Sequence, residues 1–108
     1  MSHNICLVCS HCRQVLYDDF SSASEICDLN ITYNYSPFYY KYFDKELGIK
    51  WLNKKIAEIT TYKLMTAIKE FKTNPDDINY KKEEEAKLIL RKLLAFALAN
   101  PGGIWSIS

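Results

Sequence analysis

The period of hydrophobic and polar positions in this chain changes near residue 36. Before that point strand-forming residues dominate, and after it apolar residues recur every three or four positions, the spacing of an amphipathic helix. The alternation is cleanest in Ile31-Thr32-Tyr33-Asn34-Tyr35, where the apolar residues share one face of a strand and the polar residues project from the other. The pattern therefore predicts strands first and helices afterwards.

The predicted element order is β-β-β-α-α-α-β. The expected strands are a hairpin over residues 4–17, a third strand over 25–35 and a final strand over 104–107. The expected helices span 37–47, 60–72 and 81–100, with a start nearer Asn53 as the alternative for the second, and a helical connector is expected at 49–52. Ser36 suits an N-cap, Pro37 a first helical residue and Gly48 a helix end. We expect the final strand to pair within the N-terminal sheet. The predicted fold class is α+β: a small antiparallel sheet (N-terminal hairpin, third strand, C-terminal strand) covered by about three helices.

Length and charge narrow the class of protein. A chain of 108 residues fits one domain, here a cysteine-containing hairpin and loop over 1–29 followed by residues 30–108. The formal net charge of +1 does not favour a nucleic-acid partner, which calls for a basic excess. No apolar run approaches the roughly 20 residues of a membrane span, and the first residues lack the pattern of a signal peptide. We therefore expect a cytoplasmic protein with no membrane partner.

The cysteines carry the clearest chemical signal. Cys6, Cys9 and Cys12 follow one another at C-x-x-C spacing, and Cys27 lies on the expected third strand. Zinc prefers four thiolate or imidazole ligands in a tetrahedron, and a C-x-x-C turn presents two thiolates to one ion. The spacing favours a structural zinc site formed by these four cysteines, with His11 or His3 as substitutes for Cys6. Free thiols without metal are the competing interpretation, ahead of a disulfide or redox role.

The aromatic-rich stretch 30–43 and the following Trp51 supply a candidate ligand-binding surface. Asparagine side chains offer paired donors and acceptors, and aromatic rings can stack on a base. The candidate ligand-binding residues are Asn30, Thr32, Tyr33, Asn34, Tyr35, Tyr39 and Trp51. The competing interpretation is that the rings form the core where strand and helix meet, and that the asparagines satisfy local backbone groups.

Catalytic signatures are missing from the sequence. It contains no phosphate-cradling glycine loop, no nucleophile elbow and no paired-histidine metal motif, so we expect a protein that is not an enzyme. A small enzyme of unknown chemistry is kept as an alternative, with Asp28 and Asp44 or Asp76 and Asp77 as the carboxylates that could pair. A run of lysines from Lys41 to Lys55 is interpreted as a solvated face.

The segment Asn30-Ile31-Thr32-Tyr33-Asn34 resembles the N-I-T-x-N motif of a family of small phage and prophage proteins. In that family the motif leads into three helices and a short strand containing tryptophan, and some members carry a preceding C-x-x-C pair. Here the resemblance spans about residues 28–108, and Asn100-Pro101-Gly102-Gly103-Ile104-Trp105 matches the ending. The chain departs from the family over residues 54–58, where relatives often have a glycine-containing turn.

The family carries no assigned activity, so the resemblance implies context rather than mechanism. It implies a non-enzymatic accessory binding protein in the host cell cytoplasm. Its expected role is anti-defence, by sequestering a nucleotide-derived signal or by blocking a host defence protein. A zinc-stabilised interaction or nucleic-acid-binding module is the alternative, although only Arg13 and Arg91 supply arginine. Homo-oligomerisation is left open.

Overall fold

The computed structural model describes residues 2–11, 14–18, 25–26, 28–32, 35–71 and 80–107. Its elements, in chain order, are β1 (Ser2–Val8), β2 (Tyr17–Asp18), β3 (Glu25–Ile26), β4 (Asp28–Thr32), α1 (Ser36–Tyr42), the 3₁₀ helix η2 (Gly48–Leu52), α2 (Ala57–Glu70), α3 (Tyr80–Ala99) and β5 (Ile104–Ile107). These elements confirm the predicted α+β class.

The main sheet has the antiparallel order β4-β1-β5, with β1 in the centre. Ile5 pairs with Leu29 on one side and with Ile107 on the other, and Leu7 pairs with Trp105. Because side chains alternate along a strand, these apolar residues share the inner face, and Ile5, Leu7 and Trp105 are fully buried. The expected pairing of the final strand with the N-terminal sheet is confirmed.

The predicted hairpin and third strand are divided between two sheets. Leu16 donates its backbone N–H to Leu7, and Val15 bridges to Val8, so the hairpin begins as expected. The chain then leaves the main sheet, and β2 pairs with β3 as a separate two-stranded sheet. The segment expected as one strand over 25–35 is therefore β3 and β4, which belong to different sheets.

The first helix is shorter than the predicted span of 37–47. It begins at Ser36, with Tyr35 rather than Ser36 at the N-cap and no side-chain cap, and it ends at Tyr42. The carboxylate of Asp44 accepts hydrogen bonds from the backbone N–H groups of Glu46 and Leu47, which stabilises a turn in place of further helix. The helical connector predicted at 49–52 is confirmed as η2.

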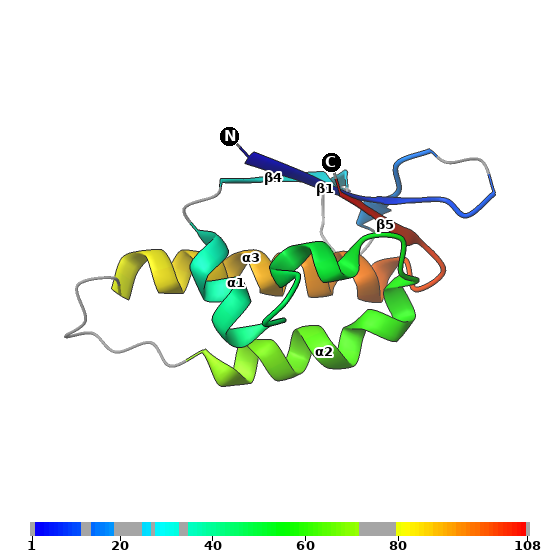
Figure 1. Ribbon diagram of the computed structural model, residues 1–108. Coiled ribbons are helices and arrows are strands. Elements are labelled where there is room, and N and C mark those ends of the chain that lie inside the picture. Colours follow the sequence, from blue (N-terminus) through cyan, green and yellow to red (C-terminus); the bar gives the residue numbers. More distant parts are fainter. Residues whose placement is uncertain are drawn as a thin grey trace.

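The three α-helices lie on one side of the main sheet, and α2 and α3 run side by side (Figure 1). Their buried faces and the inner face of the sheet enclose one hydrophobic core. The core residues are Ile5, Leu7, Ile31, Tyr39, Phe43, Ile49, Leu52, Ala57, Leu64, Ala67, Phe71, Ala86, Leu90, Leu93, Phe96, Ala97 and Trp105. None of the described helices combines the length and the apolar surface that a membrane crossing demands.

Residues 54–57 run along the outer edge of β5. Lys54 donates its backbone N–H to the Trp105 carbonyl, Trp105 donates to Lys55, and Ala57 donates to Gly103. Ile56 also forms an isolated antiparallel bridge with Ile104. β5 is thus hydrogen-bonded along both edges, to β1 and to this segment.

Candidate functional site

The outer face of the main sheet, on the side away from the helices in Figure 1, presents polar side chains to solvent. We call it the open sheet face. It comprises Asn4, Cys6, Asn30 and Ser106: Asn4, Asn30 and Ser106 are exposed, and Cys6 is half-buried. Asn4 lies opposite Asn30 across β1 and β4, and Cys6 lies opposite Ser106 across β1 and β5.

The Asn4–Asn30 pair is the central feature of this face. Asn30 Nδ2 donates a hydrogen bond of 2.5 Å to Asn4 Oδ1. Each asparagine amide has one acceptor oxygen and two donor hydrogens, so the pair uses only one donor and one acceptor position. The Asn30 oxygen and the Asn4 amino group make no hydrogen bond with other described residues. The two amides therefore present unused donor hydrogens and an acceptor oxygen to solvent. The opposite face of the sheet packs against the helices.

Of the other residues predicted for this strand, the structure describes some and not others. Thr32 ends β4, and its backbone pairs with Ser2. Tyr33 and Asn34 lie outside the described residues. Asn30 is exposed and Ile31 is 1% exposed, which is the alternation that the sequence predicts for this strand. The ligand-binding role of the polar residues stays a prediction.

Two of the candidate tyrosines connect α1 to α3. Tyr35 donates its hydroxyl to Glu85 Oε2 over 2.5 Å, and this hydrogen bond raises the pKa of Tyr35, as do burial and the Glu85 charge. Tyr39 is 1% exposed and donates to the Ala86 carbonyl at 3.3 Å; burial raises its pKa. Tyr39 therefore packs as a core residue, whereas Tyr35 lies at the edge of the core.

A third tyrosine reveals a site that the sequence did not indicate. Tyr42 donates its hydroxyl to Glu83 Oε1 at 2.9 Å, and Glu83 is only 4% exposed. The Tyr42 ring also packs against Phe71, with 4.5 Å between centroids. Glu83 lies in the first turn of α3, where an acidic residue suits the helix dipole. Nothing near it in the chain shows that a tyrosine from α1 contacts it.

Trp51 lies in a separate cluster of rings and cations. Its ring meets Phe43 edge-on at 5.8 Å between centroids. The ammonium groups of Lys63 and Lys55 lie 4.4 Å and 4.7 Å from the Trp51 ring centroid, within range of cation–π attraction. Among the described residues, no hydrogen bond or ring contact joins Trp51 to Asn30, Tyr35 or Tyr39.

Asp44 anchors this cluster from the end of α1. It accepts a hydrogen bond and forms an ion pair with Lys63 Nζ at 3.2 Å. The backbone N–H of Leu47 lowers the pKa of Asp44 most, against a smaller opposing effect of burial, and the Glu46 N–H and Lys63 lower it further. Asp44 thus has structural partners, and Asp28, its predicted partner in an enzyme site, lies on β4.

The structure describes two of the four candidate zinc ligands. Cys6 lies on β1 and Cys9 in the turn that follows it, both half-buried, whereas Cys12 and Cys27 lie outside the described residues. The backbone N–H of His11 points at Cys9 Sγ over 3.5 Å. Within the described part of the chain, no three His, Cys, Asp or Glu side chains form a metal-holding group. The four-cysteine site stays a prediction.

The chain was compared with protein families, curated proteins and solved structures. No protein-family model, no curated protein and no solved structure matches the chain.

Proposed function

We propose that this protein is a non-enzymatic binding module that holds a small, nucleotide-derived ligand on the open sheet face. The observation that supports this is the exposed Asn4–Asn30 pair, held between two adjacent strands. Asparagine amides read the edges of nucleobases because they pair a donor with an acceptor. A pair fixed by a ladder of backbone hydrogen bonds needs little further ordering when a ligand arrives, which favours affinity.

The resemblance to the N-I-T-x-N family gives this proposal its biological setting. A phage accessory protein of this kind would act in the host cytoplasm and remove a nucleotide-derived signal by sequestering it. Binding through neutral amides agrees with the formal net charge of +1, since it needs no basic surface. The same face could instead block a host defence protein, and the two versions differ in the size of the partner.

Ligand screening by melting temperature tests the sequestering version. Mononucleotides, cyclic mononucleotides and dinucleotides at about 1 mM would be added to the purified chain, because a ligand at 100 times its Kd stabilises a protein by about 2.7 kcal/mol. We expect at least one probe to raise the melting temperature and Asn30→Ala and Asn4→Ala to abolish that rise. Gln14→Ala, which removes an exposed amide in the hairpin turn, should leave it unchanged.

The outcome of the screen decides between the versions. If no probe changes the melting temperature and native mass spectrometry shows no bound small molecule, the sequestering version is wrong. The blocking version predicts a host protein that co-purifies with the wild-type chain and is lost with Asn30→Ala. Retention of that protein by Asn30→Ala would place its contact elsewhere.

A second candidate function, a zinc-stabilised interaction module, is favoured by the Cys9 turn. A backbone N–H directed at a cysteine sulfur stabilises the thiolate form that binds metal, and His11 N provides such a contact at 3.5 Å. Cys6, Cys9, Cys12 and Cys27 would be the ligands. Metal analysis of the protein purified without chelator should give about one zinc per chain. Less than about half an equivalent would contradict a four-cysteine site.

A further inference from the structure

The outer surface of α3 carries an exposed seam with a regular spacing. Positions 81, 84, 88, 91, 95 and 98 follow each other at steps of three and four, the spacing by which two helices pack along a common line. The residues are Lys81, Glu84, Leu88, Arg91, Ala95 and Leu98. Leu88 is 61% exposed and Leu98 is 54% exposed, so two leucines on this seam face solvent although the opposite side of α3 forms the core.

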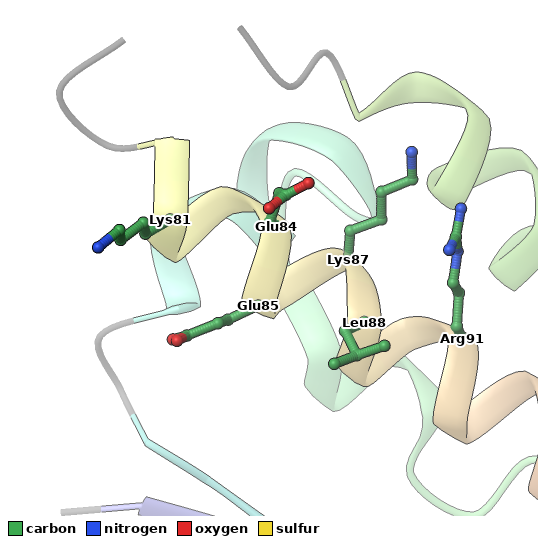
Figure 2. A pocket seen from close by; sticks show the side chains of 6 residues that line it. All are labelled: Lys81, Glu84, Glu85, Lys87, Leu88 and Arg91. Atoms are coloured by element: carbon green, nitrogen blue, oxygen red, sulfur yellow. The ribbon is translucent and has the colours of Figure 1, made fainter. Parts of the chain in front are cut away.

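The seam is hollowed around Leu88. A shallow depression of about 350 Å³ is lined by Lys81, Glu84, Glu85, Lys87, Leu88 and Arg91. Figure 2 shows Leu88 in the middle of this surface, with Glu84, Lys87 and Arg91 extending to one side of the helix and Glu85 to the other. No ion pair joins Glu84 to Lys87 or Arg91 among the described residues.

Two of these charges, Glu84 and Arg91, lie nearly symmetrically about Leu88. Glu84 precedes it by one helical turn and Arg91 follows it by nearly one turn, and both side chains extend to the same side (Figure 2). If a second helix with this sequence lies antiparallel across the seam, with Leu88 against Leu88, each Glu84 falls opposite the other copy's Arg91. The seam is therefore complementary to itself, as a twofold-symmetric contact requires.

We propose that the α3 seam is the contact surface of a homodimer, in which two copies pack antiparallel about Leu88 and form two reciprocal Glu84–Arg91 ion pairs. The two Leu88 side chains supply the apolar centre and the ion pairs set the register. A parallel arrangement would place like charges together, and a shifted antiparallel one would separate Glu84 from Arg91. A contact along one helix is smaller than a standard protein interface. We therefore expect association in the micromolar range. The proposal does not depend on the function of the open sheet face.

Charge exchange tests the proposed register. Glu84→Lys places a lysine opposite Arg91 of the second copy, and Arg91→Glu places a glutamate opposite Glu84. We expect each variant alone to be monomeric by sedimentation velocity, at concentrations from about 5 to about 500 µM. Mixed in equal amounts they should form a heterodimer, since every charge then faces its opposite, and the double variant should recover the homodimer.

Leu88→Glu should also give a monomer, because it brings two carboxylates together at the twofold axis. Tyr62→Glu is the matched control, since Tyr62 is 63% exposed on α2 and lies off the seam; it should dimerise like the wild type. Circular dichroism and melting temperature would establish that every variant is folded. A wild-type chain that stays monomeric throughout the range overturns the proposal. So does a wild-type dimer whose charge variants fail to recombine, or one that Tyr62→Glu disrupts.

Discussion

Trp105 and Thr60 form a hydrogen bond inside the core: the indole Nε1 donates to the Thr60 hydroxyl at 2.9 Å, and both residues are fully buried. The same hydroxyl donates to the Ala57 carbonyl at 2.7 Å, so Thr60 links the first turn of α2 to β5. Every buried side-chain nitrogen and oxygen among the described residues has a partner. This pair therefore carries a direct test of the packing between sheet and helices.

Thr60→Val keeps the shape of the side chain and removes the acceptor for the Trp105 N–H. A buried donor without a partner costs about 1–3 kcal/mol, so we expect the free energy of unfolding in urea to fall by that amount. Thr60→Ser keeps the hydroxyl and should lose less. Equal stability of Thr60→Val and the wild type would show that the hydrogen bond does not form.

Tyr42→Phe should destabilise the chain by about 1–3 kcal/mol, because it leaves the buried Glu83 carboxylate without its donor. The measurement is chemical denaturation of Tyr42→Phe, Glu83→Gln and the double variant, from which the coupling between the two side chains follows. Glu70→Gln is the control: it changes an exposed glutamate at the end of α2, outside the α3 seam. Strictly additive losses would mean that the two side chains do not interact.

Acid should weaken the link between Asp44 and its partners. The folded protein lowers the pKa of Asp44 below its usual value of 3.8, so the stabilisation from its charged form is complete above that value and is lost as pH falls through the lower folded value. We expect Asp44→Asn to be less stable than the wild type at neutral pH and to lose less stability below about pH 4. Thermal melts across this range measure both. Parallel curves for the two proteins would contradict the pKa direction.

Gly48→Ala should cost about 1–2 kcal/mol, the cost of a left-handed backbone conformation for a residue with a Cβ. Gly48 has φ +58°, and an added Cβ would lie 3.4 Å from the Tyr40 ring. Gly102→Ala is the matched control, because nothing lies within 4 Å of a Cβ added there. Urea denaturation compares the two variants. Equal free energies of unfolding for Gly48→Ala and Gly102→Ala would mean that position 48 has no requirement for glycine.

Local patterns predict the fold where neighbours in sequence decide the structure. The alternation of Asn30 and Ile31 gives the two faces of β4 correctly, and the periodic residues of the last helix give α3 within one residue at each end. The predicted bounds fail where a distant contact decides. The first helix stops at Tyr42. Asp44 follows it, accepts a hydrogen bond from the Leu47 N–H in a turn and forms an ion pair with the distant Lys63. No pattern within residues 37–47 encodes Lys63.

The candidate site could be predicted only in part, because several of its residues have partners that are distant in the sequence. Asn30 could be assigned to a polar strand face, but its partner Asn4 is known only once β1 and β4 are in register. Tyr39 is an aromatic residue of the kind that binds ligands, but it packs against α3, which is distant in the sequence, and its hydroxyl donates to Ala86 there. Glu83 shows the reverse: a residue typical of an exposed helix start is buried by Tyr42.

The pairing of β1 with β5 has a consequence for how the protein folds. Ile5 and Ile107 are adjacent in the sheet although nearly the whole chain lies between them, and closing such a large loop slows folding. The α2–α3 contact, by contrast, joins consecutive helices. We expect the helical pair to form early and the central ladder late. Until the ladder forms, the backbone of β1 has an open edge, and crowded refolding would favour pairing between chains at that edge.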